Sequence, residues 1–461
     1  MNIVIAGAGE VGRELAWSFW DQRNNITVVD RSAGLLERLR DRLDVMTVHG
    51  DCAVVETLKA ARIAEAELFI AATGSDASNV LACGIARHFK VGRTVCRLSN
   101  AGLFCEADGW TPAGLGIDHI IFPDAECIAQ ICDALEHQAV VERIVLSYPG
   151  AECTALRLSP ESSLVGSSLH DFPDPEVLAR TRFPAIVRQR RLVMPRGGTV
   201  LQAGDEVYIA GEHHAVAALR DRFWPDHDAS GPVLVAGANR LTRQLVPRLC
   251  DSGLSVRVIE ASEEPATLFL DELGRRAMLI RGAATDSDVL EEAGVNGCRA
   301  FISMLDDDED NILCSLLAKQ QGARKVITVT NKAEYVDIVP AMGAIDCGFS
   351  PRLAAVNSVL KTVTTDEVRV QAVLNRARAH IYEFRVVPGV PLCGCRLADC
   401  RLPPSAVFAL VIRRAEALAA TGDLIIEPDD RVVMIATPEH ARDLEKLLTR
   451  RSFLKIARRF A

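Results

Sequence analysis

Residues 1–12 of the chain read MNIVIAGAGEVG, an apolar run followed directly by a glycine-rich turn. The apolar run predicts a buried strand over 2–6, and the G-x-G-x-x-G spacing after it is typical of the loop that opens a Rossmann-type strand–helix–strand unit. A second apolar run, at 25–30, ends in Asp30. In this fold a carboxylate at the end of the second strand accepts hydrogen bonds from ribose hydroxyls. The start of the chain therefore predicts an α/β domain with a dinucleotide site.

Each glycine of this loop has its own physical role. Gly7 permits the tight turn, Gly9 lets the backbone approach a pyrophosphate, and Gly12 allows the following helix to pack closely. That helix begins near Glu10 and points its unpaired N–H groups at the phosphates. The carboxylate of Asp30 would repel a 2′-phosphate, which favours NAD(H) over NADP(H). The loop residues that we predict to contact the cofactor are Gly7, Ala8, Gly9, Glu10, Val11 and Gly12.

Further candidate residues stand at the ends of the later strands of this domain. Asp51 follows the third strand, where it could reach the adenine side of the ligand. Thr73 and Gly74 end the fourth strand, near the expected ribose or nicotinamide half, and Arg97 closes the fifth strand, where it could meet phosphate charge. The alternative interpretation gives Thr73 and Asp76 a helix-capping role and leaves Arg97 in a surface pair.

The same layout returns in the second half of the chain in an altered form. Gly237 and Glu260 are separated by the same number of positions as the first glycine and the acid of the first copy. Asn239 and Thr242 replace the second and third glycines, so side chains stand where a pyrophosphate needs bare backbone. Arg240 adds a possible phosphate partner. We therefore include Gly237, Asn239, Arg240 and Glu260 among the candidate cofactor-binding residues. The second cleft either binds a nucleotide differently or weakly, or is a structural relic.

The repeat extends well beyond the two loops. Corresponding segments are 50–51 and 282–283, 76–79 and 308–311, and 164–166 and 392–394. Such a register indicates an internal duplication. We predict two tandem Rossmann-like parallel-sheet domains, each followed by a small α+β subdomain. The predicted boundaries are 1–124, 143–227, 232–350 and 371–453, with a helical stretch at 124–141 and a polar linker at 225–232.

Composition excludes several functional classes. A net charge of −9 argues against general nucleic-acid binding. No uninterrupted apolar stretch approaches the roughly 20 residues that span a bilayer. The first predicted strand follows Met1 directly and occupies the place where a signal peptide would lie, so we expect none. We therefore expect a soluble cytoplasmic protein whose membrane contact is peripheral.

No motif for metal binding or catalysis emerges from the sequence. The fourteen cysteines are scattered through apolar segments, so we expect reduced structural thiols and no metal site. The acidic run 306–310 could suit a cation, but acids at a helix start also complement the helix dipole, and we favour the latter. The ten histidines form no clear constellation with Lys or Asp partners, and His213-His214 is expected to be exposed. We therefore predict no catalytic residue, and keep an NAD-dependent oxidoreductase as the alternative.

Two ordered sets of residues resemble RCK (regulator of potassium conductance) domains. The first loop, Asp30, 76–79 and 116–123 look like the N-terminal part of an RCK domain, and 163–207 looks like its C-terminal subdomain. Two such pairs in tandem are similar to the peripheral NAD-binding subunits of Trk potassium-uptake systems.

This resemblance implies a cytoplasmic homotetramer whose ring of RCK domains docks on a membrane-embedded potassium transporter subunit. It also implies that NAD(H), and in some members ATP or ADP, binds the N-terminal subdomains and biases transport. Glu10 places a negative charge beside the phosphate loop, which is unfavourable for a triphosphate unless Arg13 or Arg97 offsets it. Asp205 and Asp430 are expected to stabilise turns of the C-terminal subdomains.

The C-terminal segment 450–461 gives a separate hint about membrane contact. Phe453, Ile456 and Phe460 fall on one helical face among basic residues. Such a face could touch anionic lipid or the transporter, or it could be a solvated helix end.

Overall fold

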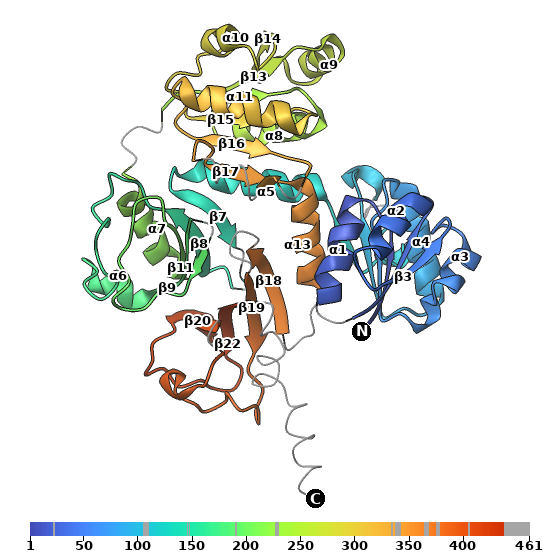
Figure 1. The fold of residues 1–461 in the computed structure, drawn as a ribbon, viewed down its shortest axis with the longest axis horizontal. Coiled ribbons are helices and arrows are strands. Elements are labelled where there is room, and N and C mark those ends of the chain that lie inside the picture. Colours follow the sequence, from blue (N-terminus) through green and yellow to red (C-terminus); the bar gives the residue numbers. More distant parts are fainter. Residues whose placement is uncertain are drawn as a thin grey trace, which may run out of the picture. The chain divides into compact units, whose positions relative to one another are not determined.

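The computed structural model describes residues 1–21, 24–104, 110–144, 146, 148–189, 191–225, 230–332, 335–336, 343–363, 368–374, 379–403 and 406–437 (Figure 1). The basic segment 450–461 and part of the predicted linker lie outside these residues. The chain divides into two compact units, one formed by 1–127 with 350–363 and the other by 128–349 with 364–461.

A six-stranded parallel sheet forms the centre of the first unit. Its strands are β1 (Asn2–Ala6), β2 (Asn25–Asp30), β3 (Met46–His49), β4 (Leu68–Ala71), β5 (Arg93–Arg97) and β6 (His119–Ile121), in the order β3-β2-β1-β4-β5-β6. The order reverses between β1 and β4, and ligands of such sheets bind beyond the carboxyl ends of the strands at that point. The glycine loop follows β1 and therefore lies at this position.

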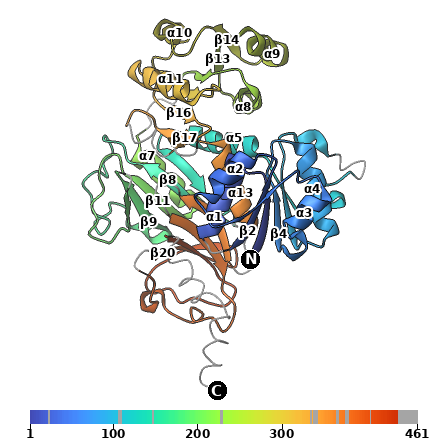
Figure 2. The same cartoon turned by 45° about the vertical axis from the view of Figure 1, so that its right-hand side comes forward.

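Helices cover both faces of the sheet. They are α1 (Glu10–Asp21), α2 (Ala33–Arg40), α3 (Val55–Ala60) and α4 (Asp76–His88). Figure 2 shows α1 and α2 on one face and α3 and α4 on the other. Because both faces are covered, residues 3–6 of β1 are all buried, which explains why this strand is apolar throughout rather than alternating.

The second unit contains a sheet of the same topology. Its strands are β12 (Val233–Ala236), β13 (Val256–Glu260), β14 (Met278–Arg281), β15 (Ala300–Ser303), β16 (Val326–Val329) and β17 (Cys347–Phe349), in the order β14-β13-β12-β15-β16-β17. Its helices are α8 (Arg240–Asp251), α9 (Glu263–Leu273), α10 (Ser287–Glu292) and α11 (Asp308–Gln320). The matching order confirms the predicted duplication of a Rossmann-like domain.

Two antiparallel five-stranded sheets complete the second unit. One has the order β10-β9-β11-β8-β7, with strands β7 (Val140–Ile144), β8 (Ala151–Arg157), β9 (Thr181–Arg188), β10 (Arg191–Val193) and β11 (Glu206–Glu212) and helices α6 (Pro175–Arg180) and α7 (His213–Phe223). The other has the order β18-β19-β22-β20-β21, with β18 (Val368–Leu374), β19 (Ala379–Arg385), β20 (Ala406–Arg413), β21 (Glu416–Ala419) and β22 (Arg431–Ala436). The two sheets contact each other through β9 and β11 on one side and β20 and β21 on the other. The predicted fold class, with a small α+β subdomain after each parallel sheet, is confirmed.

The turns before β11 and β22 are built alike. Asp205 is 1% exposed, pairs with Arg188 and accepts the Gln202 N–H at 2.9 Å. Asp430 is equally buried, pairs with Arg413 and accepts a backbone N–H at 2.8 Å. The prediction that these two acids stabilise turns is confirmed.

Helix α5 (Pro123–Glu136) is shorter than the predicted helical stretch 124–141. The buried Lys325 donates from Nζ to the carbonyl oxygens of Ala134, His137 and Val140, at 2.5, 2.9 and 2.7 Å. These bonds take the carbonyls that a longer helix would use internally, and the β-branched residues that follow join β7 instead.

Helix α13 (Pro351–Val363) plays the corresponding part in the first unit. Although it comes from the second half of the chain, it packs against α1 and β6. Arg93, at the start of β5, donates from Nη1 to the carbonyl oxygen of Thr362 at 2.6 Å, close to the end of α13. Each half of the chain thus supplies a cation to the end of a helix from the other half.

Candidate nucleotide site

The first glycine loop is tightly packed around Gly7 and Gly12 and open at Gly9. Gly7 has a φ of 109°, and a Cβ there would lie 2.8 Å from the carbonyl oxygen of Ala72. A Cβ on Gly12 would lie 1.8 Å from the carbonyl oxygen of Gly7. A Cβ on Gly9, by contrast, would meet no atom within 4 Å. The fold therefore requires Gly7 and Gly12, while Gly9 leaves an open approach to the backbone at the start of α1.

Asp30 fastens this loop to the end of β2. Its Oδ2 accepts the N–H of Ala8 at 2.6 Å, and its Oδ1 accepts the N–H of Ser32 at 2.7 Å. Each carboxylate oxygen can accept a further bond, and the residue is only half-buried. The position therefore fits both the structural role seen here and the predicted ribose contact, and the residues present suit a dinucleotide.

Asp51 lies next to the residue that follows Asp30. Its carboxylate accepts the N–H of Ala53 and pairs with Arg31 at 2.5 Å, and both contacts lower the pKa of Asp51. These contacts tie Asp51 to its own loop and to Arg31, and the adenine contact predicted for Asp51 stays a prediction.

Asn79 of α4 fastens the ends of β4 and β5. Its Oδ1 accepts the N–H of Thr73 at 3.0 Å and the Thr73 hydroxyl at 2.6 Å. Its Nδ2 donates to the carbonyl oxygens of Thr73 and Arg97, at 3.1 and 2.9 Å. The Arg97 guanidinium also donates to the Thr73 carbonyl oxygen, at 3.3 Å. The structure thus brings Thr73 and Arg97 together, and their ligand contacts stay a prediction.

The two residues after Thr73 have different roles: Gly74 leaves an open position, and Ser75 caps helix α4. A Cβ on Gly74 would meet nothing within 4 Å. Ser75 is the N-cap of α4, because its side chain accepts the Ser78 N–H. Asp76 instead accepts the N–H groups of Ser99 and Asn100, which tie the loop after β5 to α4. The alternative that assigned the cap to Thr73 or Asp76 is therefore wrong, because Ser75 occupies that place.

The charge of Glu10 is met by a residue that the sequence analysis missed. Glu10, the first residue of α1, forms an ion pair with Arg352, the second residue of α13. Arg13 pairs instead with Glu14 on its own helix, at 3.7 Å. The offset by Arg13 or Arg97, which the sequence analysis named as a condition for triphosphate binding, stays a prediction. No local pattern marks Arg352, because its proximity arises only when α13 packs on α1.

The second loop keeps the turn and fills the opening. Gly237 has a φ of 97°, as the equivalent of Gly7 must. The Oδ1 of Asn239 accepts the N–H groups of Leu241 and Thr242, at 3.0 and 3.2 Å. Its Nδ2 donates to the carbonyl oxygen of Met304 at 2.6 Å. The side chain therefore takes the helix N–H groups that phosphate oxygens would bind at an open loop.

Two further side chains bond to the backbone of the second loop. Thr242 donates its hydroxyl to the carbonyl oxygen of Gly237 at 2.7 Å. Glu260, 9% exposed, accepts the N–H groups of Ala238 and Ser262, both at 2.7 Å. Arg240 begins α8 and is exposed. Cofactor binding by Gly237, Asn239, Arg240 and Glu260 stays a prediction, and the geometry favours the structural interpretation of this loop.

The acidic run before α11 is used by the fold. Asp307 is the N-cap of α11, and its side chain accepts the Asp310 N–H. Asp308 accepts the N–H groups of Asn331 and Lys332, as Asp76 does in the first copy. Within the described residues, no group of three or more His, Cys, Asp or Glu side chains could hold a metal ion. These contacts favour the helix-dipole interpretation of the run.

The structure describes thirteen of the cysteines, and all are unpaired, in agreement with the expected free thiols. Burial raises the pKa of several of them, among them Cys52, to about 11, and Cys298, to about 12. Such thiols are poor nucleophiles at neutral pH. In the described part of the chain, no helix is long and apolar enough to cross a membrane.

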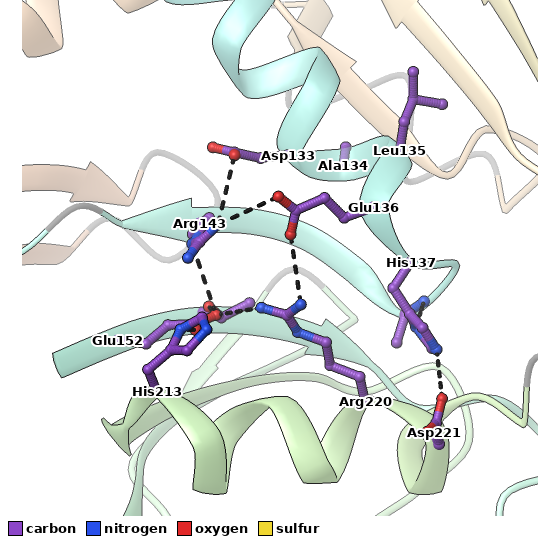
Figure 3. A network of polar contacts seen from close by, with 12 residues as sticks. Asp133, Ala134, Leu135, Glu136, His137, Arg143, Glu152, His213, Arg220 and Asp221 are labelled. Atoms are coloured by element: carbon purple, nitrogen blue, oxygen red, sulfur yellow. Dashed lines mark hydrogen bonds and ion pairs between the residues drawn. The ribbon is translucent and has the colours of Figure 1, made fainter. Parts of the chain in front are cut away.

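A polar cluster surrounds Glu152 in the second unit (Figure 3). Glu152 is 2% exposed and accepts the hydroxyl of Thr154 at 2.5 Å and Nη2 of Arg220 at 2.7 Å. Burial acts to raise the pKa of Glu152, but these donors outweigh it and leave the pKa lowered. Nδ1 of His213 lies 2.6 Å from the same carboxylate. The expected exposure therefore holds for His214 but not for His213, which is half-buried.

This cluster connects α5 to the first antiparallel sheet. Arg143 of β7 lies 3.4 Å from Glu136 and 3.9 Å from Asp133, both on α5. Arg220 of α7 also reaches Glu136, at 3.4 Å. Figure 3 shows the two guanidinium groups between the acids of α5 and Glu152. Partly buried networks of this kind hold elements in a defined geometry better than isolated surface pairs do.

The two parallel sheets with glycine loops and the two small antiparallel sheets define a class of proteins with paired α/β and β-rich domains. The TrkA-N domain model matches residues 3–123 and 233–351, and the TrkA-C domain model matches 153–223 and 381–449. The chain is 31% identical over 455 residues to the Trk system potassium uptake protein TrkA of Halomonas elongata, covering 97% of this chain and 98% of that protein. It is 28% identical to the TrkA of Vibrio alginolyticus, with coverages of 97% and 98%. The chain belongs to the TrkA family, as the resemblance in its sequence indicated.

Solved structures agree with this fold. The GsuK RCK domain superposes with a TM-score of 0.61 at 17% identity, covering 97% of this chain and 94% of that chain. The GsuK channel bound to NAD gives a TM-score of 0.61 at 17% identity, covering 97% of this chain and 78% of that one. At this identity the likeness establishes the fold alone.

Proposed function

We propose that this chain is the nucleotide-binding regulatory subunit of a potassium-uptake transporter and that NAD(H) in the first cleft sets transport activity. The observation that carries this proposal is the open backbone at Gly9. This residue lies in a tightly packed glycine loop that the half-buried carboxylate of Asp30 holds in place. Full-length relatives named as Trk system potassium uptake proteins indicate the transport system.

The ligand would be held by the polar groups of the first loop. Its pyrophosphate would lie over Gly9 at the start of α1, where unpaired N–H groups and the helix dipole favour an anion. The adenosine ribose would meet Asp30, and the other half of the ligand would lie toward Gly74. The bound nucleotide supplies charge and shape, and no bond is made or broken. ATP or ADP would bind to the same groups.

In the proposed assembly, four copies of the chain form a ring beneath the transporter. The ring lies at the cytoplasmic face of the membrane and contacts the membrane-embedded potassium transporter subunit. Nucleotide binding changes transport only if the ligand has different affinities for the two states of the ring. Couplings of this kind typically amount to about 1–3 kcal/mol per site.

Calorimetry on the full-length protein tests the binding step. NADH, NAD+, ATP and ADP are titrated into the wild type, Asp30→Ala and Glu260→Ala. We expect one NADH per chain and at least a tenfold loss of affinity in Asp30→Ala, because a charge-assisted ribose contact is removed. Glu260→Ala is the matched control, and its NADH affinity should stay within about twofold of the wild type. An absence of saturable binding in the wild type would contradict the proposal.

Two functional assays separate regulation from catalysis. Potassium flux is measured in vesicles that contain a Trk-type transporter with the bound subunit, with and without NADH. A flux that changes with NADH in the wild type but not in Asp30→Ala supports regulation. Steady oxidation of NADH by the purified protein would instead favour an NAD-dependent oxidoreductase.

A further inference from the structure

We propose that Arg352 of α13 is a phosphate-binding residue of the first nucleotide site, and that Glu10 holds it beside the loop until a nucleotide binds. This inference rests on the proposed function. It adds a residue from the second half of the chain to a site that is otherwise built entirely from the first.

The placement of Arg352 follows from two packed helices of the first unit. Its guanidinium pairs with Glu10, the residue directly after the open Gly9 and the first residue of α1. The two side chains are 30% and 39% exposed, so the pair lies at the surface of the loop and remains accessible. A pyrophosphate at the start of α1 would therefore lie within reach of this guanidinium.

The charges of the site favour a contact between Arg352 and a bound pyrophosphate. Glu10 already supplies a negative charge to the N-terminus of α1, and a pyrophosphate would add more at the same place. Two anions repel unless a cation stands between them. A guanidinium has five donors and binds phosphate oxygens in pairs, so Arg352 can bridge the ligand and Glu10 or pass from one to the other.

The second copy carries the opposite arrangement of charge. Arg240 occupies the position of Glu10, and Asp124, which follows Pro123, occupies the position of Arg352. The first loop thus takes its cation from α13, whereas the second has one within its own sequence. The first site is the one whose open loop needs a cation from elsewhere.

The consequence for regulation is that α13 senses the ligand. Helix α13 follows β17, the last strand of the second parallel sheet, with only Ser350 between them. A phosphate that draws Arg352 toward the loop acts on the start of this helix. Occupancy of the first cleft is in this way linked directly to the second half of the chain.

Three variants of the full-length protein test the assignment by calorimetry with NADH. Arg352→Gln should weaken binding at least tenfold, because the bidentate phosphate contact is lost. Glu10→Gln should strengthen binding several-fold, because a competing anion is removed. Arg13→Gln removes a cation of α1 that is 37% exposed, against 30% for Arg352, and that pairs with its neighbour Glu14; its binding should stay within about twofold of the wild type.

Hydrogen exchange at α13 provides a second measurement. NADH should protect the first turn of α13 in the wild type and not in Arg352→Gln. If Arg352→Gln fails to fold, Arg352→Lys replaces it, because it keeps the charge but loses the paired donors. We then expect binding several-fold weaker than in the wild type.

The outcomes distinguish this inference from the proposed function. If the wild type binds NADH and Arg352→Gln, or Arg352→Lys in its place, binds it within twofold as well, the role of Arg352 is overturned and the proposed function stands. If the wild type itself does not bind, the proposed function fails first, and the role of Arg352 fails with it.

Discussion

The two glycine loops of this chain share one backbone plan and differ in what fills it. Both have a glycine with positive φ after the first strand. In both, the acid at the end of the second strand accepts the N–H of the alanine that follows this glycine. At the following position, Gly9 leaves space, whereas Asn239 turns its side chain back onto the start of its own helix. The comparison teaches that a nucleotide loop can be closed from within, with its own side chain making the contacts that a phosphate would make.

The largest expected effect separates the third positions of the two loops. Gly12→Ala should abolish measurable NADH binding, a loss of about a hundredfold or more, because the new Cβ would collide with the carbonyl oxygen of Gly7. Thr242→Ala, at the equivalent position, should leave NADH binding unchanged and cost about 1 kcal/mol of stability through one lost buried hydrogen bond. Calorimetry and thermal unfolding measure the two effects. Wild-type binding by Gly12→Ala would show that the two loops do not differ at this position.

An intermediate effect is expected at the two cations that bond to the ends of α5 and α13. Lys325→Met should lower the stability of the second unit by about 2–3 kcal/mol, since several carbonyl oxygens at the end of α5 lose a buried donor. Arg93→Met removes a donor from one carbonyl oxygen of α13 and should cost about 1 kcal/mol. Thermal unfolding of the two variants gives the order. Equal shifts in Tm would contradict the asymmetry between these two helix ends.

The smallest effect concerns the cap of α8. Asn239→Ala should cost about 1 kcal/mol, because two helix N–H groups lose their acceptor. The NADH stoichiometry should stay at one per chain. Replacing Asn239 and Thr242 together by glycine sharpens the comparison, because a second equivalent of NADH would show that these two side chains alone close the second loop. A wild-type stoichiometry of two would refute the closure.

Much of the fold could be predicted because strand patterns are local. The strand predicted at 2–6 is β1 of the structure, and the apolar run at 25–30 is β2. The helix predicted at 124–141 was wrong at its end, because the terminating residue Lys325 belongs to a distant part of the sequence. Hydrophobic periodicity carries no information about such a partner.

The candidate site likewise has residues whose roles follow from the sequence and residues whose contacts do not. The roles of Gly7 and Gly12 follow from the spacing of the loop and agree with the backbone geometry. The contacts of Asp51 and Glu10 do not follow from it. Asp51 depends on the side-chain direction of Arg31, and Glu10 depends on the packing of α13 against α1. Charges placed by tertiary packing were beyond the reach of the sequence pattern.

The burial of Lys325 against the end of α5 has a consequence for the history of the chain. Lysines are almost never fully buried without partners, and the partners of this one belong to the other copy of the repeat. Dividing the duplicated gene would separate this lysine from its partners. A separate second half would expose or strand the lysine, and a separate first half would leave its helix end without a donor. The contact therefore favours keeping the two halves in one chain.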